Sequence, residues 1–285
     1  MTFSEYLQQK KFAKSTIHSY SIYIQKFLGW LQDEAIDNEV FTYNDLLEFM
    51  RHCQNNGVTK HSVHMILCIV RHYCNWLITE GKRNDNPAAG VFIKGLVRKL
   101  PTNLLSMEEM EELYKQYSIQ LNVDSSKKIM FGLMIYQGIT VGELMRLQSD
   151  HIKLKEGKIF IKGTKRTNER LLHLQAIQMN ELQSYLNANK FKEGSLFIEP
   201  VKKEVSERNI NNRIKYMFDQ LRKLNPKVIN AKQIRSSVIT FWLRQNNLRQ
   251  VQYMAGHKYV SSTERYQANN LDDLQNELKE HHPMS

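Results

Sequence analysis

Five residues in the second half of this sequence carry groups that bind phosphate, transfer protons or attack as nucleophiles: Lys162, Lys232, Arg235, His257 and Tyr266. Lys232 and Arg235 are three residues apart, a spacing that places both cations on one face of a helix. Tyr266 follows His257 by nine residues. Each feature is common by itself, so any inference depends on their occurring together in this order.

Four segments around these residues resemble the sequence boxes of the tyrosine recombinase (phage integrase) family. They are Tyr136-Gln-Gly-Ile-Thr-Val-Gly-Glu-Leu-Met-Arg-Leu147, Ile161-Lys-Gly-Thr-Lys165, Asn230-Ala-Lys-Gln-Ile-Arg-Ser-Ser237 and Met254-Ala-Gly-His-Lys-Tyr-Val-Ser-Ser-Thr-Glu-Arg-Tyr266. In the same order they are similar to the family's boxes GLRxxELxxL, GKGNK, H-x-L-R-H and LGH…(S/T)T…Y. The N-terminal part is similar to the family's helical core-binding domain. The resemblance therefore covers nearly the whole chain, whose 285 residues suit the compact Xer-like size class.

This resemblance implies phosphoryl transfer from DNA to the hydroxyl of Tyr266, leaving a 3′-phosphotyrosyl link and a free 5′-hydroxyl. Fixed cations stabilise the charge that develops on the phosphate oxygens. The planar fork of Arg235 matches two of those oxygens, and Lys232 and His257 add further donors. Lys162, at the start of a hairpin, suits the general acid, since an ammonium can lose a proton where a guanidinium cannot.

The sequence departs from the family's pattern at two positions. The first catalytic arginine of the family falls at Thr140, which carries no charge, and the histidine of its second box falls at Lys232. Lys165, Arg166 and Arg170 in the hairpin region are predicted to contact DNA. Any of these three could supply the missing charge, and the residues themselves leave that choice open.

The elements that must position these residues begin with four predicted helices in residues 1–82. A short helix covers residues 2–10, and Ser15 or Thr16 caps a second. Apolar residues at helical spacing predict a third helix from Tyr43 to about Asn55 and a fourth from Val63 to Ile78. These helices predict a compact helical core-binding domain that binds DNA.

A catalytic domain is predicted over residues 105–285. Helices are expected from Ser106, at about 125–137, 175–188, 206–224, 231–246 and 248–255, and a last one at 271–280. Between the second and third of these, short apolar runs at 152–161 and 171–174 predict a small antiparallel sheet with a basic hairpin tip. The predicted fold class is thus mainly α with a small antiparallel sheet. The resemblance implies that the helical core-binding domain and the catalytic domain together form a clamp on DNA.

Residues 83–104 are predicted to form a basic linker between the two domains. Pro87 and Pro101 oppose helix there, and Arg98 and Lys99 form a cation pair that would contact DNA. An ordinary solvated loop explains the same composition equally well.

The net charge of +11 predicts a polyanionic partner, and double-stranded DNA is the one that the resemblance names. The charge is uneven: residues 202–235 carry ten basic side chains against three acidic ones. No apolar run reaches the ~20 residues of a membrane span, so no membrane partner is expected. Three cysteines without CxxC spacing indicate neither a disulfide framework nor a zinc site. The sequence also has no HExxH motif and no tight carboxylate cluster near these motifs, so no metal and no cofactor are expected.

Three functions remain open on this sequence. The first is a site-specific DNA recombinase acting in integration, excision, inversion or dimer resolution in a prokaryotic cytoplasm. The second is a catalytically impaired family member that binds DNA as an accessory or regulatory protein. The third is a type IB topoisomerase, which shares related tyrosine chemistry. For the first, the resemblance implies a tetrameric synapse on DNA in which the helix at 271–280 docks on a neighbouring protomer, although packing on its own domain explains that helix equally well.

Overall fold

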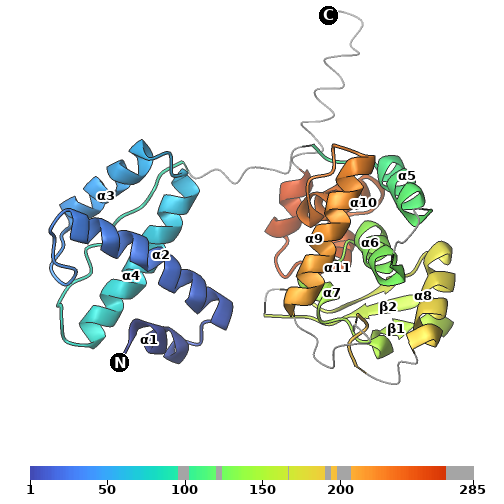
Figure 1. Ribbon diagram of the computed structural model, residues 1–285, viewed down its shortest axis with the longest axis horizontal. Helices are drawn as coiled ribbons and strands as arrows, with labels where there is room; N and C mark the ends of the chain where they lie inside the picture. Colours follow the sequence, from blue (N-terminus) through green and yellow to red (C-terminus); the bar gives the residue numbers. More distant parts are fainter. Residues whose placement is uncertain (96–102, 120–123, 166, 190–193, 198–206, 268–285) are drawn as a thin grey trace, which may run out of the picture. The chain divides into compact units, whose positions relative to one another are not determined.

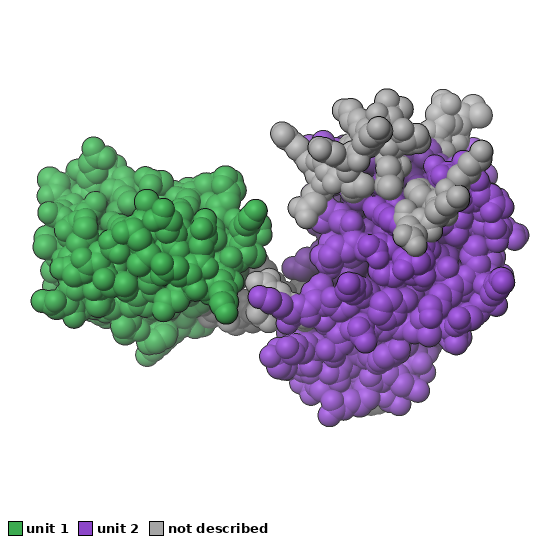
Figure 2. All heavy atoms as spheres, turned by 90° about the horizontal axis from the view of Figure 1, so that it is seen from below, with its two compact units in different colours: residues 1–98 green, residues 99–285 purple. Residues whose placement is uncertain are grey.

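The structure, a computed structural model, describes residues 1–95, 103–119, 124–165, 167–189, 194–197 and 207–267. The chain divides into two compact units, Met1–Arg98 and Lys99–Ser285, which Figure 2 colours separately. Each unit has a hydrophobic core of its own. Throughout the described ranges the fold is helical apart from one small antiparallel sheet, which confirms the predicted fold class.

Four helices form the described part of the first unit, as predicted. They are α1 (Phe3–Gln9), α2 (Lys14–Asp33), α3 (Tyr43–Asn55) and α4 (Lys60–Thr79), shown in blue to cyan in Figure 1. Threonine hydroxyls cap α1, α3 and α4 by accepting a backbone N–H of the first turn. The start predicted for α2 is wrong, because that helix begins directly after Ala13, which has no capping side chain, and Ser15 and Thr16 lie within its first turn.

Aromatic side chains fill the core of the first unit. The ring of Phe27 on α2 meets the rings of Phe41 and Phe49 edge-on, with centroids 5.1 and 5.0 Å apart. Such edge-to-face pairs add stabilisation beyond the burial of their area. This core fixes α2 and α4 side by side.

The segment after α4 belongs to the first unit over its initial residues, which differs from the linker predicted at 83–104. Ala88 and Val91 are buried in the unit's core. Arg71 on α4 holds this segment, donating from Nε to the Ala88 carbonyl at 2.9 Å and from Nη2 to the Val91 carbonyl at 2.6 Å. The cation pair Arg98 and Lys99 lies outside the described residues.

Helix α6 (Ser125–Gln137) lies at the centre of the second unit. It packs against α5 (Met107–Ser118), α8 (Ala176–Asn189), α9 (Glu207–Leu224) and α10 (Ala231–Gln245), as Figure 1 shows. Its sequence is apolar around most of its circumference, so nearly every side buries a residue. The helix ends at Gly138, whose φ of +58° is a conformation that favours glycine.

Three strands form the sheet of the second unit. In order they are β1 (Ile152–Lys153), β2 (Lys158–Ile161) and β3 (Arg170–His173), all antiparallel, with the short helical turns η1 (Ser149–His151) and η2 (Leu154–Glu156) flanking β1. Ile159 pairs with Leu172, and Ile161 pairs with Arg170. Because side chains alternate along a strand, Arg170 faces the core together with Leu172.

Two further helices belong to the second unit, and residues 261–267 are helical as well. Helix α11 (Leu248–Ala255) was predicted, whereas the four-residue helix α7 (Val141–Leu144) was not. The helix predicted at 271–280 lies outside the described residues. Within the described ranges, every helix is too short or too polar to cross a membrane.

Candidate active site

Arg235 is held between the C-terminal ends of two helices. From the second turn of α10 its Nη1 donates to the Gly138 carbonyl at the end of α6, and its Nη2 donates to the Ala255 carbonyl at the end of α11, at 2.5 Å. Both helices end in a left-handed glycine, and the negative ends of their dipoles favour a cation at this point. These contacts use two of the five N–H donors of the guanidinium. Its side chain remains 11% exposed, so the other donors can face a ligand.

A buried ion pair lies beside Arg235. The guanidinium of Arg170 donates to both carboxylate oxygens of Glu143, at 2.7 and 3.1 Å, and the two side chains are 0% and 2% exposed. The Arg235 Nη1 is 4.0 Å from the same carboxylate. One carboxylate therefore faces two guanidiniums, which leaves a net charge of one cation in the cluster.

Thr140 binds the same carboxylate from the start of α7. Its backbone N–H and its hydroxyl each donate to Glu143 Oε2 at 2.9 Å, and the Glu143 N–H returns a bond to the hydroxyl. This reciprocal arrangement is a capping box, which explains why a helix of only four residues forms here. Thr140 is half-buried, and it places no charge in the site.

These neighbours set the charge state of Glu143. Burial by itself would raise the pKa of this carboxyl group. The hydrogen bonds and charge of Arg170, the charge of Arg235 and the N–H of Thr140 outweigh burial and hold the pKa at about 2. Glu143 is therefore ionised at every pH at which the protein would act.

The hairpin between β2 and β3 is attached to the turn that follows α11. The Asn168 N–H donates to the Gly256 carbonyl at 3.0 Å, and Thr167 forms a β-bridge with His257. Gly256 has a φ of +66°, and a Cβ built on it would lie 2.5 Å from Arg170 Nη1. Glycine is therefore required at this position both by its backbone conformation and by the guanidinium packed against it.

The imidazole of His257 is fixed by two neighbours. Its Nδ1 is 2.8 Å from the hydroxyl of Thr263, which is fully buried, and its ring is stacked on Tyr266, with centroids 6.1 Å apart. Burial and the charges of Arg235, Arg265 and Arg170 lower the pKa of His257 to about 4. The ring is thus neutral at pH 7 and presents one N–H donor and one acceptor.

Tyr266 is close to Arg235 as well as to His257. Burial lowers the pKa of the Arg235 guanidinium. The charges of Glu143 and of Tyr266 act in the opposite direction and raise this pKa. The phenol is thus within electrostatic range of the guanidinium. Arg235, His257 and Tyr266 therefore come together in space from α10, the turn after α11 and the segment that follows it.

The lysines predicted for the site lie at its edge. Lys162 follows the last residue of β2, and Lys232 is one turn before Arg235 on α10; both side chains are exposed. Among the described residues neither side chain forms a hydrogen bond or ion pair, so both ammonium groups are available to a ligand. The structure does not bring them into contact with Arg235, His257 or Tyr266.

The hairpin cations divide into three cases. Lys165 is exposed at the tip, between Thr164 and Thr167, whose hydroxyls are 2.9 Å apart. Arg166 lies outside the described residues. Arg170 was predicted to contact DNA, and this prediction is wrong for the structure described. Side chains alternate between the two faces of β3, and the side chain of Arg170 lies on the buried face, where it pairs with Glu143.

Sequence reasoning missed three contributors to this site: Glu143, Thr263 and the buried role of Arg170. The spacing Thr140-Val-Gly-Glu143 is a capping-box signature, which predicts that the Glu143 carboxylate accepts a hydrogen bond from the backbone N–H of Thr140. In the strand Arg170-Leu-Leu-His173, alternation places Arg170 on the face of Leu172. A buried arginine needs a carboxylate partner, which would have pointed to Glu143.

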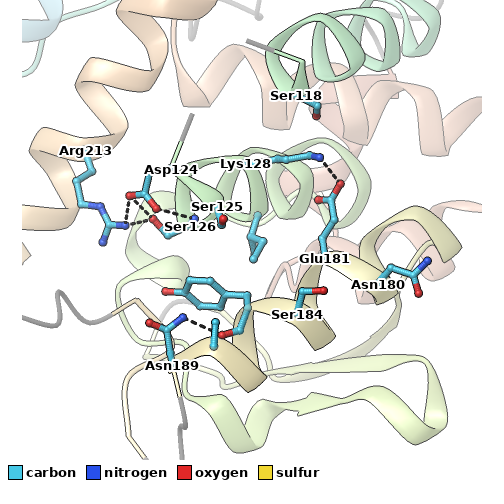
Figure 3. A pocket seen from close by; sticks show the side chains of 13 residues that line it. Ser118, Asp124, Ser125, Ser126, Lys128, Asn180, Glu181, Ser184, Asn189 and Arg213 are labelled. Carbon is cyan, nitrogen blue, oxygen red and sulfur yellow. Dashed lines mark hydrogen bonds and ion pairs between the residues drawn. The ribbon is translucent and has the colours of Figure 1, made fainter. Parts of the chain in front are cut away.

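A separate cavity of about 680 Å³ opens between the start of α6 and α8 (Figure 3). Its charged side chains are paired, Lys128 with Glu181 at 2.6 Å and Arg213 with Asp124 at 3.0 Å. None of the described residues lining it belongs to the cluster around Arg235. Across the described ranges, no group of three or more His, Cys, Asp or Glu residues is placed to hold a metal ion.

The cluster around Arg235 can bind a phosphate and present a nucleophile to it. Arg235 and neutral His257 offer N–H donors, and Tyr266 carries the hydroxyl.

Comparison with known proteins agrees with this chemistry. Residues 103–272 match the model of the phage integrase family, and residues 1–81 match that of the phage integrase N-terminal SAM-like domain. Tyrosine recombinase XerC of Bacillus pumilus (strain SAFR-032) is 23% identical over 295 residues, covering 99% of this chain and 95% of the relative. Tyrosine recombinase XerA of Thermococcus kodakarensis is 22% identical over 267 residues, covering 93% and 88%. A solved structure of the XerH site-specific recombinase, bound to palindromic difH substrate in a post-cleavage complex, shares the fold with a TM-score of 0.73 and 17% identity, covering 92% of this chain and 78% of that one.

Proposed function

The chain belongs to the phage integrase family, and from that membership we propose that it is a site-specific DNA recombinase that cuts and rejoins double-stranded DNA through Tyr266. The observation that carries this proposal is that Arg235 on α10 meets His257 and Tyr266, which come from one short segment after α11, in one small volume. Tyr266 also packs against the core of the second unit, but core packing does not account for a neutral imidazole and a guanidinium with unused donors beside the phenol.

The reaction has one bond-forming and one bond-breaking step on a single phosphorus atom. The Tyr266 oxygen attacks the scissile phosphate, the bond from phosphorus to the 5′-oxygen breaks, and a 3′-phosphotyrosyl link forms. The proton lost by the phenol leaves to solvent or a nearby base, and the departing 5′-oxygen takes one from Lys162, the general acid. Attack by a free 5′-hydroxyl reverses these changes and rejoins the strand, so the bond energy is conserved.

Arg235 supplies the main electrostatic stabilisation. Two of its N–H groups are fixed on helix ends, which pre-orients the rest of the fork toward the phosphate oxygens. Lys232 and His257 donate to the same oxygens in this proposal. Because the guanidinium of Arg235 is already fixed, it needs no reorganisation when the phosphate reacts, and this is the property that makes fixed donors effective.

The DNA contacts of the proposal extend beyond the cleavage site. Lys165 at the hairpin tip would bind backbone phosphates, as would Arg166 and the pair Arg98 and Lys99, and the two units together would clamp the duplex. The helix predicted at 271–280 would dock on a neighbouring protomer in a tetrameric synapse. A lambda integrase tetramer bound to a Holliday junction, which shares the fold with a TM-score of 0.70, gives a precedent for that assembly. The setting would be a prokaryotic cytoplasm, where the protein would act in integration, excision, inversion or dimer resolution.

A second function is favoured by one observation, the uncharged Thr140. If the cluster were too weakly charged for cleavage, the protein would bind DNA as an accessory or regulatory family member. Losing one charged donor to a transition state costs ~10²–10³-fold in rate, which a slowly acting recombinase can tolerate.

The experiment that separates the two uses a nicked suicide duplex, built on the sequence that the protein selects from a pool of random duplexes. We expect the parent protein and Tyr259→Phe to form a covalent protein–DNA adduct and Tyr266→Phe to form none. Tyr259 is a matched control, since it is 66% exposed and lies in the same segment. Retained gel-shift binding without any adduct from the parent protein would instead establish the DNA-binding function.

A further inference from the structure

The position that lacks a cation is occupied by a side chain already engaged with Glu143. Both the N–H and the hydroxyl of Thr140 are used on Glu143 Oε2, so Thr140 itself contributes only to capping α7. The same carboxylate accepts a guanidinium that arrives from β3, where Arg170 donates in bidentate geometry. A second arginine is therefore present in the cluster, but it comes from a different part of the chain.

The charge balance explains what that arginine does. Glu143 lies 4.0 Å from Arg235, and its pKa of about 2 keeps it ionised. Without Arg170, the charge of this carboxylate would be opposed by Arg235 alone, and the pair would present no net charge to a phosphate. With Arg170 bound to both oxygens, the cluster keeps the equivalent of one whole cation, and the free donors of Arg235 face the site.

Arg170 also supports the loop that carries His257. Its Nη1 lies against Gly256, so closely that a Cβ there would be 2.5 Å away. Gly256 in turn accepts the Asn168 N–H from the hairpin. The guanidinium thus fills the space beneath the turn that leads directly into the catalytic imidazole.

We propose that Arg170 is a positioning residue that replaces the family's missing arginine at Thr140: it neutralises Glu143, so that the charge of Arg235 is directed at the DNA phosphate, and it supports the Gly256–His257 turn. This inference rests on the proposed recombinase function and names the residue that keeps a site without an arginine at Thr140 active. Arg170 is fully buried and touches no substrate, so it acts through Glu143, Arg235 and His257.

The test measures single-turnover adduct formation on the suicide duplex with the full chain at saturating protein. Arg170→Met is expected to slow adduct formation by ~10²–10³-fold, the typical effect of losing one charge-stabilising donor. Binding of the intact duplex in a gel shift should change by less than about threefold, because Arg170 makes no phosphate contact. Arg170→Lys, which keeps the charge but loses the fork, should fall between parent and Arg170→Met.

Two double variants separate the proposed role from simple structural support. In Arg170→Met/Glu143→Gln both charges are absent, so Arg235 regains an unopposed charge and adduct formation should rise at least about tenfold over Arg170→Met. In Thr140→Arg/Arg170→Met the cation is moved to the family's usual position, and the same recovery is expected. Thermal unfolding shows which variants are folded at the assay temperature. Arg213→Met, which removes an ion pair with Asp124 outside the cluster, is the matched control and should cleave at the parent rate.

Adduct formation by Arg170→Met within about threefold of the parent rate would overturn the inference. So would slow cleavage by folded Arg170→Met that neither double variant improves, because Arg170 would then serve packing alone. Absence of an adduct from the parent protein is a different result, since it refutes the proposed function before any variant is compared.

Discussion

The rings of His257 and Tyr266 lie nearly parallel, with centroids 6.1 Å apart and 11° between their planes. The segment between them is helical again from Ser261, and inside it Thr263 points back at the imidazole, with its hydroxyl 2.8 Å from Nδ1. One short segment therefore supplies the nucleophile, the donor next to it and the group that orients that donor. Changes in this segment should alter cleavage more than DNA binding.

Replacing Thr263 by Val keeps the shape of the side chain but removes its hydroxyl. The imidazole of His257 then loses the bond that fixes its orientation. A net hydrogen bond is worth about 1–1.5 kcal/mol, so we expect adduct formation to slow by ~10-fold. Single-turnover cleavage of the suicide duplex measures this directly.

Thr240→Val is the matched control for that substitution. Thr240 is buried on α10, and its hydroxyl has no partner among the described residues. Removing an unpaired buried hydroxyl should leave cleavage unchanged and stability equal or higher. Equal losses in the two variants would mean that the hydroxyl of Thr263 has no special role.

Gly256→Ala should destabilise the protein more than Gly157→Ala. Both glycines have left-handed φ values, +66° and +63°, so both substitutions cost roughly 1–2 kcal/mol in backbone strain. Only Gly256 is in contact with Arg170, whereas a Cβ at Gly157 meets nothing within 4 Å. We expect an extra loss of about 1–3 kcal/mol at Gly256 from overpacking. Urea unfolding of both variants gives the difference, and equal losses would contradict the contact.

The free energy of unfolding should depend on pH through His257. Its pKa is about 4 in the folded protein and ~6.5 when unfolded, so the unfolded chain binds the extra proton between these values. The stabilisation is complete above pH 6.5 and is lost as pH falls toward 4. Between pH 7 and pH 5 we expect a loss on the order of 1 kcal/mol that His257→Gln does not show. Urea titrations of parent and variant at both pH values test this, and parallel losses would count against it.

Cleavage is expected to persist in excess EDTA. In the proposed mechanism the charges that stabilise the reacting phosphate are those of Arg235 and Lys232, Lys162 supplies the proton, and a chelator leaves these side chains untouched. The measurement is the adduct yield in EDTA and in Mg²⁺ under otherwise equal conditions. A yield that collapses in EDTA and returns with added metal would refute the mechanism as written.

Much of the fold follows from local signals in the sequence. The bounds of α3 could be predicted from its apolar stripe and Thr42, and the start of α5 from the capping box at Ser106. The spacing of Lys232 and Arg235 placed both on one helix, and the spacing of His257 and Tyr266 marked the segment that joins them. These features depend on residues within a few turns of one another, which is why one sequence is enough to find them.

The tertiary structure alone decided which cations serve the site. Arg170 looked like a hairpin residue free to contact DNA, yet it is buried on Glu143, 27 residues earlier in the chain. The guanidinium of Arg235 is held by the main-chain carbonyls of Gly138 and Ala255, and such contacts cannot be predicted from a pattern of side chains. The sequence determined which elements form and which groups are available for chemistry. Whether a charged side chain meets water or a buried carboxylate depends on which strand face and which helix ends come together, and that is settled only when the long-range contacts of the core form.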